Sequence, residues 1–139
     1  MLREGSGVDI IAAIRESPRA LTFVSVPWSV PERHARQVFR AAVSQLEDTC
    51  PELDIRFFIL EVDEDEASRH WLATIGLPHI ASAGAGSVIW SERDRVISSE
   101  ITANALGIAG VVDRSMSQWQ CRSEPSAAGD SSYREKRNG

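Results

Sequence analysis

Apolar residues recur along the chain with two kinds of spacing, and each predicts one kind of element. Apolar positions at i, i+3 and i+4 indicate helices with one buried face. Short runs rich in β-branched and aromatic residues indicate buried strands. The predicted helices cover residues 8–16, 35–46, 67–75 and 102–112, and the predicted strands cover residues 20–26, 54–62, 87–91 and 96–99.

The order of these segments predicts a single α/β domain. Helices alternate with strands as far as residue 62, which favours parallel pairing through a right-handed crossover. The last two strands are separated by the polar turn 92–95 and form an antiparallel hairpin. Residues 1–113 therefore make up the predicted domain. Residues 114–139 lack apolar periodicity, and we expect a flexible, disordered tail.

Composition and charge exclude several classes of protein. The 139 residues are 42% hydrophobic and carry a net charge of −5, which disfavours a nucleic-acid-binding protein. The longest apolar stretches fall short of a membrane span, and Asp9 and Arg15 interrupt the one segment that could serve as a secretory signal. We expect a cytoplasmic protein with no membrane partner.

One short segment connects this element order to a known family. Trp28-Ser29-Val30-Pro31-Glu32 lies between the first predicted strand and the longest helix. The segment and the order of elements over residues 8–113 resemble thioredoxin, whose motif at this place is W-C-G-P-C. The resemblance implies a thioredoxin-like three-layer sandwich, with a central mixed sheet and helices on both faces.

The same resemblance implies that dithiol chemistry is absent. Ser29 and Glu32 stand where the family has its two cysteines, and Phe23 stands where it has a buried aspartate. A serine hydroxyl neither ionises near neutral pH nor forms a disulfide, so it cannot perform either step of dithiol exchange. The S-x-x-E spacing instead predicts a capping box, in which Ser29 and Glu32 bond to each other's backbone N–H groups.

The family also has a cis-proline before the strand that faces its active site. Two residues compete for this position. Pro78 is the nearest proline, but aligning the strand at Ser87 places Gly86 there and makes residues 77–85 an expanded loop. We favour Gly86 and keep Pro78 as the alternative.

The remaining chemistry-bearing residues give no clear site. Cys50 and Cys121 are 71 positions apart, and the three histidines lack metal-ligand spacing, so we expect no metal and no cofactor. Cys50 is expected to be an ordinary half-buried residue and Cys121 an exposed thiol. The glycine-rich segment 84–87 precedes a strand, whereas phosphate loops precede helices.

These observations give one leading hypothesis and two alternatives. The leading hypothesis is a redox-inactive thioredoxin-like protein, not an enzyme, which binds a protein or peptide through the face formed by Trp28, Ser29, Pro31, Glu32, Pro78 and Gly86. The first alternative is a single-thiol oxidoreductase of the same fold that uses Cys50 or Cys121. The second is a binder of small ligands or anions that uses the glycine-rich loop. The sequence does not predict an oligomeric state.

Overall fold

A computed structural model describes residues 2–26, 28–62 and 66–120. The observed elements, in chain order, are β1 (Leu2–Gly5), α1 (Val8–Glu16), β2 (Ala20–Ser25), α2 (Glu32–Thr49), the 3₁₀ turn η1 (Pro51–Leu53), β3 (Arg56–Glu61), α3 (Glu66–Thr74), α4 (Ile80–Ala83), β4 (Ser87–Glu92), β5 (Arg95–Glu100) and α5 (Ala103–Trp119).

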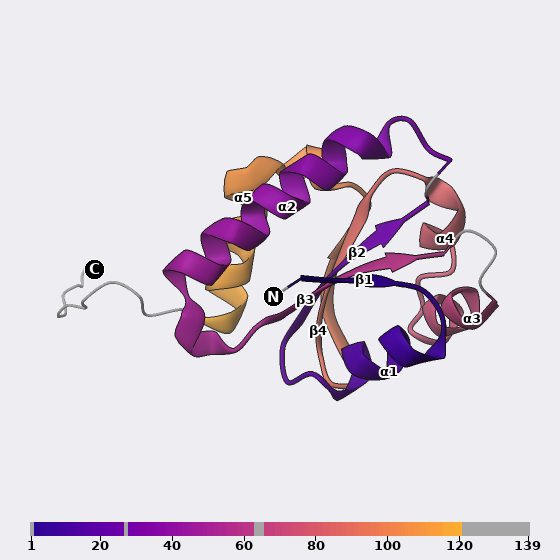
Figure 1. The fold of residues 1–139 in the computed structure, drawn as a ribbon, viewed down its shortest axis with the longest axis horizontal. Helices are drawn as coiled ribbons and strands as arrows, with labels where there is room; N and C mark the ends of the chain where they lie inside the picture. Colours follow the sequence, from indigo (N-terminus) through magenta and orange to yellow (C-terminus); the bar gives the residue numbers. More distant parts are fainter. Residues whose placement is uncertain (1, 27, 63–65, 121–139) are drawn as a thin grey trace, which may run out of the picture.

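The strands form one mixed sheet in the order β1-β3-β2-β4-β5. β1 and β2 both pair with β3 in parallel, whereas β4 pairs antiparallel with β2 and with β5. The helices α2 and α5 cover one face of the sheet, and α1 and α3 cover the other (Figure 1). This arrangement confirms the predicted three-layer α/β architecture with parallel central strands and a terminal hairpin.

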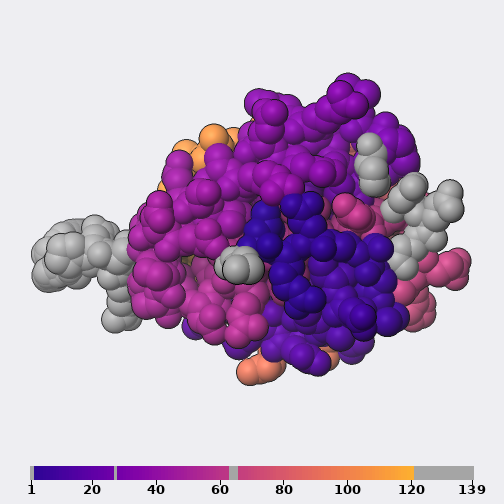
Figure 2. All heavy atoms as spheres, in the orientation of Figure 1, coloured from indigo at the N-terminus to yellow at the C-terminus, as the bar shows by residue number. Residues whose placement is uncertain are grey.

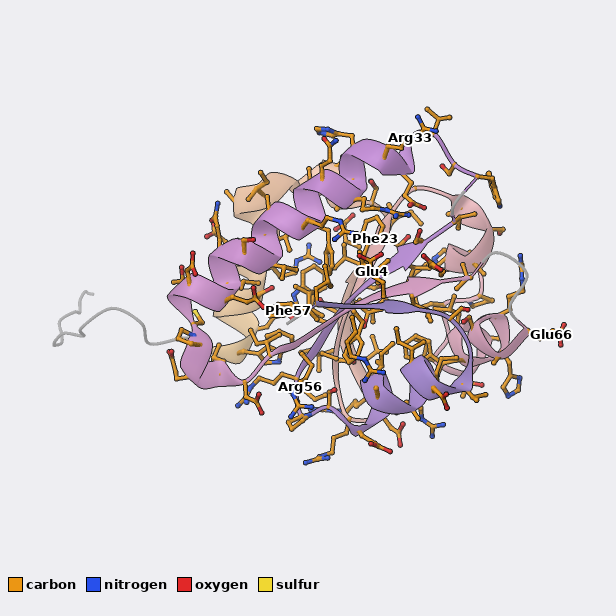
Figure 3. All side chains as sticks on the ribbon, viewed as in Figure 1. Glu4, Phe23, Arg33, Arg56, Phe57 and Glu66 are labelled. Atoms are coloured by element: carbon orange, nitrogen blue, oxygen red, sulfur yellow. The ribbon has the colours of Figure 1, made fainter. Side chains whose placement is uncertain are left out.

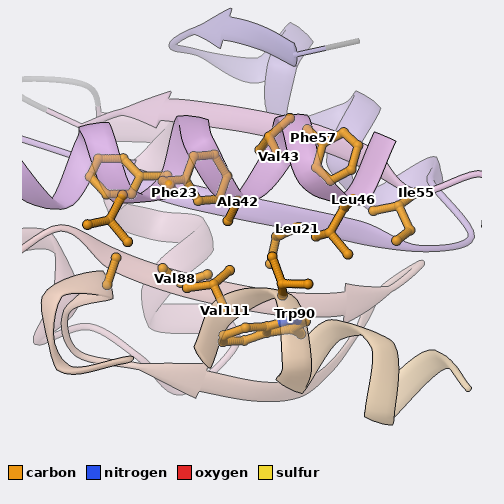
Figure 4. Packing of buried hydrophobic residues seen from close by; sticks show 14 of the residues in the cluster. Leu21, Phe23, Ala42, Val43, Leu46, Ile55, Phe57, Val88, Trp90 and Val111 are labelled. Carbon is orange, nitrogen blue, oxygen red and sulfur yellow. The ribbon is translucent and has the colours of Figure 1, made fainter. Parts of the chain in front are cut away.

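Alternate residues of the central strands enter two separate hydrophobic cores. On β2, Leu21 and Phe23 face α2 and α5, whereas Ala20 and Val24 face α1 and α3. Figure 4 shows the first core, in which Trp90 of β4 lies against Val111 of α5. Burial on both sides explains why these strands read as nearly continuous apolar runs.

Three elements differ from the sequence prediction. The strand β1 was not predicted, because its four residues include the polar pair Arg3 and Glu4 at the sheet edge. The predicted loop 77–85 contains the short helix α4 (Ile80–Ala83), whose Ile80 and Ala81 are buried in the second core. The N-terminal segment that contains β1, coloured indigo in Figure 2, lies beside the purple α2 on the face seen there.

The third difference is the end of the domain. The helix α5 continues to Trp119, so the predicted tail boundary at residue 113 is wrong for residues 114–119. The side chains of Ser115 and Trp119 are buried, and Trp119 donates its Nε1–H to a carboxylate oxygen of Glu92 at 3.0 Å. The rest of the predicted tail, residues 121–139, lies outside the described residues.

No helix within the described parts of the chain is long and apolar enough to cross a membrane.

Candidate functional site

The segment from Trp28 to Glu32 connects the end of β2 to the start of α2. Its turn is closed by the backbone N–H of Ser29, which donates to the carbonyl of Val26 at 2.9 Å. The Ser29 side chain is buried, and its hydroxyl donates to the carbonyl oxygen of Gly84. This bond joins two segments that lie 55 residues apart in the sequence. Figure 1 shows the β2–α2 connection passing beside α4 at the same end of the sheet.

The carboxylate of Glu32 is the most deeply buried charge near this segment, with 2% of the residue exposed. One oxygen accepts a hydrogen bond from the backbone N–H of Val26 at 2.5 Å. The other accepts from the Ser25 hydroxyl at 2.9 Å and from the Arg36 guanidinium at 2.6 Å. Arg36 also donates to the Ser25 hydroxyl at 2.5 Å. A buried carboxylate is costly unless it is paired and hydrogen-bonded, and both conditions are met here.

The capping box predicted from S-x-x-E is therefore wrong. The residue at the N-cap of α2 is Pro31, and no side chain caps this helix end. The two side chains of the predicted box have other partners, since Ser29 bonds to Gly84 and Glu32 reaches back to Ser25 and Val26. Glu32 is the first residue of α2 and points inward. Its carboxylate is therefore hydrogen-bonded by Ser25, Val26 and Arg36 and does not cap the helix.

Gly86 immediately precedes β4 and approaches both β2 and α2. Its φ is +76°, and a Cβ added there would lie 2.5 Å from the Cβ of Ala35 and 3.0 Å from the Phe23 ring. Its carbonyl accepts from the backbone N–H of Ala103 at 2.8 Å. Pro78 is exposed and lies in the connection between α3 and α4, eight residues earlier in the chain. The assignment of Gly86 to the cis-proline position stays a prediction.

Phe23 fills the space beneath α2 with an apolar ring. The residue is 0% exposed, and its ring centroid lies 5.2 Å from that of Phe39 on α2. Figure 3 shows it between the sheet and this helix. A side chain in this position offers no group that could accept or donate a proton.

Two large apolar side chains of the connecting segment, besides the exposed Pro31, remain in contact with solvent. Trp28 is 62% exposed and Val30 is 66% exposed. A Cβ added at Gly84 would lie 3.3 Å from the Trp28 ring, so the indole lies over the end of α4. We call Trp28, Val30 and the adjoining Gly84 the Trp28 face. Trp71 and Trp90, by contrast, are buried.

The other candidate groups do not join this site. Cys50 is the C-cap residue of α2 at its far end. It is 2% exposed and disulfide-bonded, so the expectation of an ordinary half-buried cysteine is wrong. Cys121 lies outside the described residues. His34, His70 and His79 are exposed and lie on or before three different helices. Within the described residues, no group of His, Cys, Asp and Glu could hold a metal ion.

Glu32, Ser25 and Arg36 are joined by hydrogen bonds, and we call these three residues the buried cluster. Sequence reasoning missed two of its members, Ser25 and Arg36. The Glu32–Arg36 spacing of four residues is a recognisable signal for an ion pair on one helix face. The contribution of Ser25 depends on the pairing of β2 within the sheet, and no local pattern indicates it.

Comparison with solved structures identifies the fold. No protein-family model and no curated protein matches the chain. It is similar in structure to thioredoxin from Fasciola hepatica, with a TM-score of 0.56 and 12% identity over 82% of this chain and 98% of that one. Its similarity to a mutant thioredoxin from Halobacterium salinarum gives a TM-score of 0.58 and 14% identity over 84% and 88% of the two chains. Its similarity to thioredoxin from Trypanosoma brucei brucei gives a TM-score of 0.58 and 11% identity over 83% of this chain and 89% of that one. The fold is thioredoxin-like.

Proposed function

We propose that this protein is a redox-inactive thioredoxin-like protein that binds a protein or peptide through the Trp28 face. The observation that carries the proposal is the pairing of two properties in one segment. Ser29 and Glu32 are fully engaged in structural hydrogen bonds, while their neighbours Trp28 and Val30 expose most of their apolar surface. A cytoplasmic location belongs to the same proposal.

Loss of redox chemistry follows from the groups at this end of α2. Dithiol exchange needs an ionised thiol at an accessible position and a second thiol to resolve the mixed disulfide. Ser29 offers a buried hydroxyl that donates to Gly84, and Glu32 offers a buried carboxylate paired with Arg36. Neither group can attack a disulfide.

Binding is supported by the exposure of the indole. Single exposed apolar residues are common, whereas exposed apolar side chains that gather in one patch mark interaction sites, and Trp28 and Val30 lie two residues apart on one turn. Tryptophan is also enriched among the residues that contribute most to protein binding. Trp28 and Val30 are held on a short turn between β2 and α2, so little conformational entropy is lost when a partner binds.

The single-thiol alternative has less support. Cys50 is held in a disulfide and so offers no thiol in this state. It is also buried at the opposite end of α2 from Glu32, and the 18 residues of this helix span roughly 27 Å. A substrate disulfide on the Trp28 face would not reach its sulfur.

The redox part of the proposal is tested by the reduction of insulin with dithiothreitol, followed by turbidity. The full-length protein is expected to leave the rate equal to that of dithiothreitol alone, and Cys50→Ser is expected to behave in the same way. Acceleration by the wild type would contradict the proposal. If Cys50→Ser then lost this acceleration, the single-thiol alternative would be supported.

The binding part can use Trp28 as its own reporter, because Trp71, Trp90 and Trp119 are each at most 7% exposed. Peptides selected from a random phage library against the full-length protein should protect its fluorescence from acrylamide quenching. Trp28→Ala should weaken their binding by about tenfold or more. The matched control is Val8→Ala, since Val8 is 70% exposed on α1 at another face and should not contribute. Peptides that bind Trp28→Ala as tightly as wild type would refute the role of this face.

A further inference from the structure

Cys50 is held in a disulfide at the end of α2, inside the first core. The residue is 2% exposed and shares this core with Leu46 and Leu53. The sequence has only one other cysteine, Cys121, which lies 71 positions further along the chain. A disulfide within one chain can therefore join no other pair of residues.

The described end of α5 returns to the region of Cys50. The helices α2 and α5 pack against each other and end on the same side of the molecule (Figure 1). Trp119, in the last turn of α5, belongs to the same hydrophobic core as Cys50. The C-cap residue of α5 is Gln120, and Cys121 is the next residue along the chain. Consecutive Cα atoms are about 3.8 Å apart, so the second cysteine occurs where the chain reaches the end of α2.

A bond at Cys50 would add a second attachment for the end of α5. The hydrogen bonds of its last turn lead to the β4–β5 hairpin, from Trp119 to Glu92 at 3.0 Å and from Gln118 to Ser98 at 2.7 Å. The disulfide would join the same turn to α2. Because it closes a loop of 71 positions, it would also restrict the unfolded chain and so stabilise the fold.

The surroundings of Cys50 leave a route to the bond. Cys50 lines a surface cavity of about 240 Å³ together with Leu46, Pro51 and Ile55, through which a small dithiol can approach. In the cytoplasm, which belongs to the proposed function, thiol reductants keep most disulfides reduced, and those that form are usually transient and redox-sensing. A disulfide in such a protein is expected to be reversible.

We propose that Cys50 and Cys121 form a reversible disulfide that links the end of α5 to the end of α2 and makes the stability of the fold respond to dithiol reductants. A thiolate of the reductant attacks one sulfur of the bond and forms a mixed disulfide, and the other cysteine leaves as a thiolate that takes up a proton. The second thiol of the reductant then displaces the remaining cysteine. The two protein sulfurs gain two electrons and two protons, and the reductant leaves as a cyclic disulfide. The protein is a substrate in this exchange, so the inference does not depend on the Trp28 face.

The bond itself is tested by mass spectrometry of the full-length protein after equilibration with oxidised glutathione. The expected product is a monomer that is lighter than the fully reduced chain by two hydrogens. Proteolysis without reductant should release a pair of peptides joined through residues 50 and 121. A disulfide-linked dimer, an adduct with glutathione or two free thiols would each overturn the intrachain bond.

The effect on stability is tested by urea unfolding of the oxidised protein with and without dithiothreitol. Reduction should lower the wild-type midpoint by about 1 M or more. Cys121→Ser should unfold at the midpoint of the reduced wild type in both conditions. This variant is preferred to a substitution of Cys50, because Cys50 is buried and its replacement also disturbs the core. Ser117→Ala keeps both cysteines and should respond to dithiothreitol as the wild type does. A wild-type midpoint that reduction left unchanged would refute this part of the proposal.

The place of the bond is tested in the folded protein by the indole ¹H–¹⁵N signals of its tryptophans. The Nε1–H of Trp119 donates to Glu92, so its signal should shift when reduction releases the end of α5 from α2. The signal of Trp28 should stay in place, because Trp28 precedes the opposite end of α2. An unchanged Trp119 signal, or a shift confined to Trp28, would overturn the link between α5 and α2.

Discussion

Gly86 is the residue whose replacement the fold should tolerate least. Its φ of +76° is unfavourable for any residue with a Cβ, and that atom would lie 2.5 Å from Ala35. We expect Gly86→Ala to lower the free energy of unfolding by about 2–4 kcal/mol, through backbone strain and overpacking together. Urea unfolding followed by far-UV circular dichroism measures this.

The control for that variant is Gly76→Ala. Gly76 has a similar φ of +84°, but no atom lies within 4 Å of an added Cβ, so only the strain remains. Its expected cost is about 1 kcal/mol. Equal costs at the two glycines would show that contact with Ala35 and Phe23 is unimportant.

Glu32 provides a second test at the residue scale. Glu32→Gln keeps the shape of the side chain but removes the charge that Arg36 and the Val26 N–H group bind. The expected loss of unfolding free energy is about 1–3 kcal/mol, measured by urea unfolding.

Glu4→Gln is the matched variant for Glu32→Gln, because Glu4 pairs with Arg40 at the surface and both side chains are more than one third exposed. It should cost less than about 1 kcal/mol. If Glu32→Gln were as mild as this, the buried cluster would contribute little to stability.

At the level of single elements, the end of α5 depends on one hydroxyl. Ser115 accepts the Nε1–H of Trp90 at 2.8 Å and donates to the carbonyl of Val111 at 2.8 Å. Ser115→Ala leaves the buried indole N–H unpaired, and we expect a loss of about 1–3 kcal/mol in urea unfolding. Ser117→Ala, two residues away and exposed, should stay within about 0.5 kcal/mol of wild type.

The same residues explain why sequence analysis ended this helix too early. Val111, Ser115 and Trp119 follow one another at intervals of four, which is the spacing of a buried helix face. The central position is polar, and a serine there breaks the apolar pattern unless its partner is known. That partner is Trp90 on β4, 25 residues earlier. The uninterrupted stripe of α2, from Ala35 to Leu46, was predicted correctly because all its buried positions are apolar.

For the molecule as a whole, the layers could be predicted but the connections between distant segments could not. Element order and strand hydrophobicity suffice for a mixed sheet covered on both faces. The S-x-x-E pattern is local and suggested a local cap, whereas the hydroxyl of Ser29 bonds to Gly84 across the end of the sheet. Trp28 is exposed in a segment that lies beyond the end of β2.

The pH dependence of stability should reveal the contact between α1 and the hairpin. The Arg15 guanidinium, by hydrogen bonding to Asp94, lowers the pKa of that carboxyl below its ordinary value of 3.8. A lowered folded-state pKa stabilises the fold at pH values above the ordinary one, and this contribution is lost as the pH falls through the folded value. Asp94→Asn should therefore be slightly less stable than wild type at neutral pH.

Urea midpoints of wild type and Asp94→Asn, measured at neutral pH and in acid well below 3.8, check this. The two proteins should converge in acid, and the effect is small because both side chains are more than half exposed. A difference that grew in acid would show that the ion pair is not its source.

The order of strands also sets a sequence of events during synthesis. β1 leaves the ribosome before the other four strands but lies at the sheet edge and pairs with β3, so residues 2–5 have no strand partner until residues 57–60 have been made. β2 then lacks its second neighbour until β4 follows. The β4–β5 hairpin needs only local contacts and forms fastest. The nascent chain therefore carries open strand edges until nearly the whole domain has emerged, which is when it is most exposed to aggregation.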